Sequence, residues 1–128
     1  MSLDNFIQSS LSSNSKTAIY ELSISDDACE SIKKATKLNV CSYKFIIEEA
    51  YIRHIRNSHA EDLHLLNELP NILNNFSHVE KSLTRNSQTG KTDVSLVFKK
   101  RLDDDTVQMV ALRVIKNKEI SLRTFFRP

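Results

Sequence analysis

The second half of the chain alternates apolar and polar residues with a period of two. Four such runs, at residues 79–85, 92–101, 106–115 and 119–126, predict strands. The segments between them are turn-like and contain Gly90, three consecutive aspartates or Lys116-Asn117-Lys118, which predicts an antiparallel meander. On regular strands the side chains of one face would pack on the helices: Leu96, Phe98, Met109, Ala111, Leu122 and Phe126. The other face would be basic and partly aromatic: Ser95, Lys99, Arg123 and Phe125.

The first half of the chain has the spacing of helices and two short strands. Residues 18–24 and 43–47 predict strands, and Ser25 or Asp26 can cap a helix that runs to about residue 37. A second helix follows the second strand, and Pro70 interrupts a third helical segment, which predicts two short helices or a kink. Residues 1–15 are rich in serine and predict a flexible arm that precedes a domain spanning 16–128.

These elements predict an α+β fold in which N-terminal helices pack on one face of a C-terminal four-stranded antiparallel sheet. The 128 residues suit one domain, and the apolar share of 40% and charged share of 27% are those of a soluble globular protein. No apolar run reaches the ~18 residues of a membrane span, and the N-terminal residues lack the basic region and long apolar core that are typical of a secretory signal. We therefore expect a cytoplasmic protein without a membrane partner.

Charge is distributed unevenly along the chain. Residues 1–78 carry 7 Lys/Arg and 10 Asp/Glu, a net charge of −3, whereas residues 79–128 carry 11 and 6, a net charge of +5. This asymmetry indicates a polyanion as partner. The single glycine excludes the glycine-rich phosphate loops of kinases, P-loop enzymes and Rossmann enzymes.

Neither the cysteines nor the acidic run indicates a metal or other cofactor. Cys29 and Cys41 match no zinc motif, so the sequence predicts a reduced pair, with Cys29 as a small buried residue. Asp103-Asp104-Asp105 is typical of a solvated turn, and no second acidic cluster nearby completes a two-metal site. We expect a mechanism without metal or cofactor.

Candidate chemistry is concentrated in residues 51–61, which hold two histidines and two arginines. On a helix, Ile52, Ile55 and His59 share one stripe, and His54 lies on a neighbouring face. Imidazole has an ordinary pKa of about 6.5, so such a pair beside guanidinium groups suits proton transfer near a phosphate. A helix end with one packed and one solvated ring has the same spacing, so both interpretations stay open. His64 and His78 are expected to be ordinary surface residues.

Three motifs occur in a characteristic order. The first motif is Tyr51-Ile52-Arg53-His54-Ile55 with His59, and the second is Glu68-Leu69-Pro70-Asn71-Ile72-Leu73. The third is a set of predicted strands that include Val97-Phe98-Lys99-Lys100, Val110-Ala111-Leu112-Arg113-Val114 and Ser121-Leu122-Arg123-Thr124-Phe125-Phe126. Over residues 18–127 this order resembles the phage-encoded branch of the Barnase, EndoU, colicin and RelE-like (BECR) nucleases. The chain departs from that pattern at Ala60, where glycine is common, and at Phe76-Ser77, where proline is expected.

The resemblance implies metal-independent RNA cleavage, in which a ribose 2′-hydroxyl attacks the adjacent phosphate and leaves a 2′,3′-cyclic phosphate. Carried over by position, His59 and His54 are the acid/base candidates, Lys99 stabilises the phosphate and Thr124 donates a hydroxyl. Four arginines are candidates for binding RNA phosphates: Arg53, Arg56, Arg113 and Arg123. Each strand residue also has a structural interpretation, because Lys99 lies in a basic strand end, Thr124 suits any strand and Arg123 can shield a sheet edge.

Two questions stay open at this point. The first concerns the strand that contains Arg123 and Thr124. On a regular strand these two side chains face opposite ways, so both reach one phosphate only through a bulge; the resemblance favours Thr124 and the alternation favours Arg123.

The second question is the function. The preferred function is a ribonuclease of phage or toxin type, acting in a bacterial or phage-infected cell on RNA such as transfer RNA. It would act on no DNA, and an immunity or inhibitor protein is a candidate partner. The alternatives are a non-catalytic RNA- or protein-binding module of the same fold and an inactive structural phage component.

Overall fold

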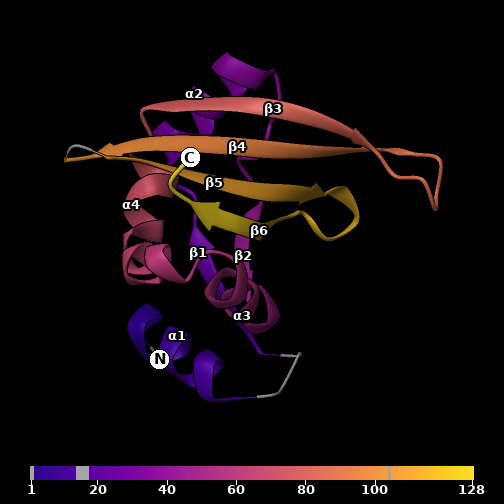
Figure 1. Ribbon diagram of the computed structural model, residues 1–128. Helices are drawn as coiled ribbons and strands as arrows, with labels where there is room; N and C mark the ends of the chain where they lie inside the picture. The colour runs from indigo at the N-terminus through magenta and orange to yellow at the C-terminus, as the bar shows by residue number, and fades with distance from the viewer. Residues whose placement is uncertain (1, 14–17, 104) are drawn as a thin grey trace.

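The computed structural model describes residues 2–13, 18–103 and 105–128. Within these residues, six strands form one sheet in the order β1-β2-β6-β5-β4-β3 (Figure 1). The strands are β1 (Ile19–Ser23), β2 (Lys44–Glu48), β3 (His78–Arg85), β4 (Thr92–Leu102), β5 (Asp105–Val114) and β6 (Glu119–Phe126). The α-helices are α1 (Leu3–Ser12), α2 (Asp26–Thr36), α3 (Glu49–Ser58) and α4 (Leu69–Asn74), and the 3-10 helices are η1 (Ala60–Glu68) and η2 (Ile115–Asn117).

The α+β prediction is confirmed, but the prediction of a four-stranded sheet is wrong. Strands β3 to β6 form the predicted antiparallel meander. Strand β2 then adds to β6 in parallel, with Phe45 opposite Ile120, and β1 pairs antiparallel with β2. Alternation identified β1 and β2 as strands, but a local pattern does not say which distant edge a strand will join.

The core lies between the helices and one face of the sheet. Ile52 and Ile55 of α3, Leu66 of η1 and Ile72 of α4 pack there with Phe98 of β4, all fully buried. Figure 1 shows α1 and α3 below the meander in that view, while α2 lies beside β3 at the opposite margin. The opposite face of the meander, here called the outer face, carries only half-buried or exposed side chains on β4 and β5. No helix in the described ranges is long and apolar enough to span a membrane.

Residues 3–12 form helix α1 where the sequence predicted a flexible arm. The side chain of Ser2 caps this helix by accepting a hydrogen bond from the backbone N–H of Asn5. Phe6 and Ile7 are buried, and the Phe6 ring lies 5.5 Å from the ring of Tyr20. The serine-rich composition obscured an apolar stripe that becomes a stable face only when the other helices cover it. Residues 1, 14 and 15 of the predicted arm lie outside the described residues.

Pro70 divides the segment between α3 and the meander into two short helices, as the sequence predicted. It occupies the first turn of α4, where its missing N–H removes no helical hydrogen bond. The turn around Gly90 is also as predicted, since this glycine has a φ of +71°.

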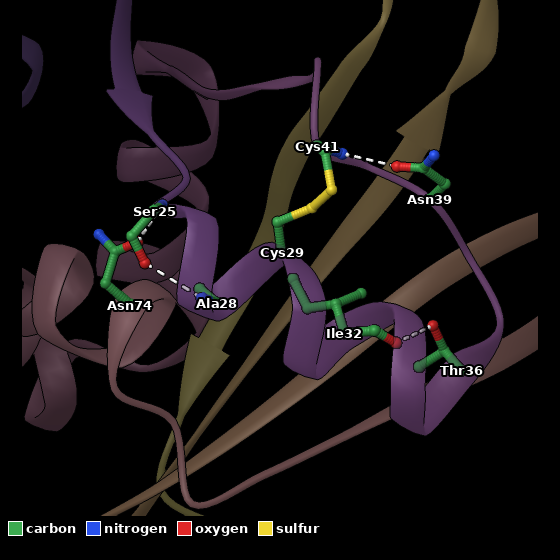
Figure 2. The surroundings of a disulfide bond; sticks show 8 residues. All are labelled: Ser25, Ala28, Cys29, Ile32, Thr36, Asn39, Cys41 and Asn74. Atoms are coloured by element: carbon green, nitrogen blue, oxygen red, sulfur yellow. Dashed lines mark hydrogen bonds between the residues drawn. A yellow bond between two sulfur atoms is a disulfide. The ribbon is translucent and has the colours of Figure 1, made fainter.

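A disulfide joins Cys29 of α2 to Cys41 in the loop before β2 (Figure 2). The prediction of a reduced pair is therefore wrong, although Cys29 is buried as expected, with 1% of its surface exposed. Near Cys41, the side chain of Asn39 accepts a hydrogen bond from the Cys41 N–H at 3.1 Å. The turn after α2 begins with Lys37 in the left-handed conformation (φ 68°). It is the path of this loop that brings the sulfurs together, and the cysteine spacing alone does not show it.

Candidate active site

Strand β6 contains one residue more than the facing part of β5. Leu122 lies opposite Ala111 and Thr124 lies opposite Val110, so Arg123 has no partner between them. The extra residue is a β-bulge, and a bulge shifts the alternation of side chains along a strand by one position.

This shift corrects the predicted faces of two aromatic residues. Phe125 is fully buried and lies opposite Met109 in the core, whereas Phe126 is half-buried and lies opposite Gln108. The prediction had Phe126 on the helix side and Phe125 on the outer face. It was wrong because it assumed a regular strand through Arg123.

The bulge also places Arg123 and Thr124 on the same face of β6. Each lies on the side opposite to the core residues Leu122 and Phe125. The two residues that a regular strand would separate are therefore neighbours on the outer face.

Arg123 is held by Tyr51 at the start of α3. Its guanidinium donates a hydrogen bond to the Tyr51 hydroxyl, and its Cζ atom lies 4.7 Å from the centroid of the Tyr51 ring. Burial lowers the pKa of Arg123 from its usual value, which the nearby Glu48 carboxylate partly offsets. The exposed His54 lies beside Tyr51 on α3, with the two ring centroids 6.5 Å apart and the rings edge to face. Tyr51 thus connects Arg123 with one of the two candidate histidines.

His59 lies at the C-terminal end of α3, where its backbone N–H donates to the carbonyl of Ile55 at 2.7 Å. Its ring stacks on Phe126 of β6, with centroids 5.0 Å apart and planes inclined by 20°. The half-buried imidazole is therefore fixed beside the end of β6.

Thr124 lies between the Arg123 bulge and Phe126 in β6. Its Oγ1 is buried and has no hydrogen-bond partner among the described residues. Buried hydroxyls are nearly always paired, so an unpaired one next to Arg123 calls for an explanation. Because this oxygen has almost no exposed surface, a substrate oxygen could accept its proton only after a neighbouring side chain moved aside.

Lys99 lies on the same face but two strands away from β6. It is opposite Gln108 of β5, which in turn is opposite Phe126, so about 10 Å separates the backbones of Lys99 and Phe126. The ammonium group lies 3.4 Å from a carboxylate oxygen of Glu80 on β3. The structure thus places Lys99 on the outer face without bringing it beside Thr124.

The other three predicted arginines lie elsewhere. Arg53 donates hydrogen bonds to the carbonyls of Ser10 and Ser13, and Arg56 donates to the carbonyl of Leu11, so both hold the C-terminal end of α1. Arg113 is opposite the core residue Ile120 and therefore lies on the helix-side face of the sheet. None of the three lies on the outer face beside Thr124.

Residues 24–127 match the family described as phage-Barnase-EndoU-ColicinE5/D-RelE like nuclease3. The chain belongs to this nuclease family. The resemblance seen in the sequence is therefore confirmed at the level of the superfamily and its phage-associated branch. Neither a curated protein nor a solved structure matches the chain.

Two groups in the described part of this nuclease domain have the donor atoms of a metal site. The first is Cys29, Glu30 and Cys41, but its sulfurs are joined in the disulfide. The second is His59, Glu61 and Asp62, but both carboxylate oxygens of Asp62 accept hydrogen bonds from Arg127. In the first group the sulfurs would have to give up the disulfide to hold an ion, and in the second an ion would compete with Arg127 for the Asp62 carboxylate. Of the acidic run, Asp103 is an exposed turn residue and Asp105 opens β5, while residue 104 lies outside the described ranges.

Four residues that contact the candidate groups or lie next to them were absent from the sequence-based site. Tyr51 and Phe126 contact Arg123 and His59, and Asp62 and Arg127 lie next to the His59–Phe126 pair. Tyr51 lies three positions before His54, a helical spacing that could have indicated it. No local pattern indicates that Asp62 and Arg127 meet, because they belong to opposite halves of the nuclease domain.

Proposed function

We propose that this nuclease domain cleaves RNA without a metal ion, by attack of a ribose 2′-hydroxyl on the adjacent phosphate. The observation that supports it is the β6 bulge, which presents the Arg123 guanidinium and the Thr124 hydroxyl on one face. The His59 ring stacks on Phe126, two residues after Thr124, and His54 lies beside Tyr51, which binds Arg123. These are the groups that a phosphorane with two proton transfers requires.

In the proposed step, the two imidazoles carry out the two proton transfers. The O2′–P bond forms as one imidazole takes the proton of the 2′-hydroxyl, and the P–O5′ bond breaks as the other, protonated, imidazole gives its proton to the leaving oxygen. The products are a 2′,3′-cyclic phosphate and a free 5′-hydroxyl. Arg123 and Thr124 stabilise the negative charge on the two non-bridging oxygens.

We assign the remaining cations to other tasks. Lys99 lies two strands away from Thr124, with β5 between them, so we propose that it binds a neighbouring phosphate of the RNA instead of the one that is cleaved. Arg53 and Arg56 hold α1 and Arg113 lies on the helix side of the sheet, so we no longer assign these three to the RNA.

The decisive experiment is incubation of the purified protein with total cellular RNA in excess EDTA, followed by mapping of the fragment ends. We expect discrete fragments with cyclic phosphate ends. His59→Ala and His54→Ala should each cleave about 10²-fold or more slowly while staying folded by circular dichroism. His64→Ala is the matched control, because this exposed histidine of η1 lies outside the candidate site and should leave cleavage unchanged.

The chemical step has its own test. An RNA oligonucleotide with a single 2′-deoxy nucleotide at the mapped site should resist cleavage there, because the nucleophile is missing. Cleavage of this oligonucleotide, or cleavage that appears only when a divalent metal replaces EDTA, would contradict the proposal.

A second candidate function is RNA binding without cleavage. It is favoured by the aromatic and cationic character of the site, since Tyr51, Arg123 and Phe126 offer planar groups on which bases can stack. Retention of RNA by a folded wild-type protein that leaves every RNA intact would select this function. We further propose action in a bacterial or phage-infected cytoplasm, on an RNA such as transfer RNA, and control by an inhibitor protein.

A further inference from the structure

Asp62 of η1 is a buried carboxylate tied to the residue that follows β6. Only 1% of Asp62 is exposed. Its Oδ2 accepts a hydrogen bond from the Arg127 backbone N–H at 3.0 Å, and its Oδ1 accepts one from Arg127 Nε at 2.5 Å. The other end of the Arg127 guanidinium donates to Asp105 of β5 at 3.1 Å. The loop after α3 is thereby joined to the end of the meander.

This ion pair lies beside the stack of His59 on Phe126. Phe126 directly precedes Arg127 in the chain. On the other side, the backbone N–H of Asp62 donates to the carbonyl of His59 at 2.9 Å. Each ring of the stack is therefore attached, through a short stretch of backbone, to one member of the ion pair.

Asp62 is a carboxylate at neutral pH despite its burial. Burial alone would raise the pKa of Asp62, but the hydrogen bonds and charge of Arg127, with a smaller contribution from His59, bring it below its usual value. The negative charge is thus permanent under physiological conditions. It holds the Arg127 guanidinium and lies close enough to His59 to attract a positive charge on that ring.

Stability alone is a weak explanation for this pair. The Asp62 carboxylate loses its hydration on burial, whereas 34% of the Arg127 side chain stays exposed. An ion pair of which one charge is buried in this way often contributes little net stability to folding. The pair instead fixes a geometry. Asp62 accepts two hydrogen bonds from Arg127, one from its backbone and one from its side chain, and these determine how η1 packs against the end of β6.

We propose that Asp62 and Arg127 are positioning residues for His59. The pair holds the start of η1 against the end of β6 and thereby keeps the imidazole stacked on Phe126 in the orientation that proton transfer requires. This inference rests on the proposed role of His59 in RNA cleavage. It adds two residues that touch neither the RNA nor the reacting atoms.

The test combines NMR of the His59 ring with cleavage kinetics. A ring stacked on Phe126 has its proton resonances shifted upfield by the aromatic ring current, and Phe126→Leu gives the reference for the loss of this shift. We expect Arg127→Ala to lose most of the shift and to lower kcat by about 10- to 10²-fold, with KM within about threefold. Asp62→Asn should have a smaller effect on both, because the amide oxygen can still accept one hydrogen bond. If Arg127→Ala does not fold, Asp62→Asn decides by the same two readouts.

Asp105→Asn is the matched control. It removes the other carboxylate that Arg127 contacts, which is exposed, and should leave both the shift and kcat unchanged. An unchanged His59 shift in folded Arg127→Ala and Asp62→Asn proteins would overturn the positioning role, even if their activity fell. Failure of the wild-type protein to cleave any RNA would instead refute the proposed function, and the NMR arm would still show whether the pair orients the ring.

Discussion

Leu122 and Phe125 are both fully buried on the helix side of β6, although three positions separate them along the strand. A regular strand returns to the same face every second residue, so the pair is possible only because Arg123 is an extra residue between them. The same bulge brings Arg123 and Thr124 to the outer face together. One inserted position thus decides both the packing of the core and the composition of the candidate site.

Removal of the unpaired Thr124 hydroxyl should affect RNA cleavage and stability differently. Thr124→Val replaces a buried hydroxyl that has no partner among the described residues with a methyl group of the same shape. We expect the free energy of unfolding to stay the same or rise by about 1 kcal/mol, while RNA cleavage falls at least tenfold. Urea denaturation and initial rates measure the two effects. Thr124→Ser should retain cleavage, and a Val variant with wild-type activity would exclude Thr124 from the site.

Arg53 should matter for folding and not for RNA. Its hydrogen bonds to the carbonyls of Ser10 and Ser13 cap the end of α1, so Arg53→Ala should destabilise the domain by about 1–3 kcal/mol and speed amide exchange in α1. RNA affinity, measured by fluorescence anisotropy at fixed salt, should stay within about twofold. Arg123→Ala is the comparison, and it should weaken RNA binding. Equal losses of affinity in the two variants would show that Arg53 also contacts RNA.

The disulfide makes stability depend on redox conditions. It closes a loop between residues 12 positions apart, so reduction or Cys41→Ser should lower the free energy of unfolding by about 2–3 kcal/mol. Urea denaturation with and without dithiothreitol tests this, and the Cys41→Ser protein should no longer respond to the reductant. Disulfides persist mainly in oxidising compartments, so activity under reducing conditions bears directly on the proposed cytoplasmic action.

Asp62 should make the domain sensitive to acid. Its pKa is lowered on folding, so its contribution to stability is fully present above its ordinary value of about 4 and is lost as the pH falls toward the folded-state pKa. The wild-type protein should therefore lose its stability advantage over Asp62→Asn between about pH 5 and pH 2. Denaturation curves of both proteins across that range provide the measurement. An advantage that does not change with pH would show that Asp62 is not charged in the folded state.

Much of the architecture was predictable because it depends on local backbone periodicity. Alternation located the four strands of the meander to within one or two residues, and Ser25 caps α2 as its side-chain chemistry predicts. The exceptions are informative. Helix α1 was not predicted, because its serines resemble a flexible segment. The two N-terminal strands were predicted, but their position in the sheet was not.

The candidate site was less predictable than the fold. The resemblance named His54, His59, Lys99 and Thr124, and the structure places these residues on or beside one face of the sheet, with Lys99 farther away. Their roles stay predictions until cleavage is measured. Tyr51 and Phe126, which hold Arg123 and His59, were identified from the contacts of β6 with α3 and with the residue that follows α3.

By itself, the sequence determined the strands of the meander, the break at Pro70, the α+β class and the family. Only the tertiary structure decided that β2 pairs with β6, that Arg123 is a bulge, that Arg53 and Arg56 hold α1, and that Cys29 meets Cys41. The reason is physical: periodicity, caps and turns depend on a few neighbouring residues, whereas each of these contacts joins distant parts of the chain. Such contacts are selected by the burial of the whole core, which no local stretch of sequence contains.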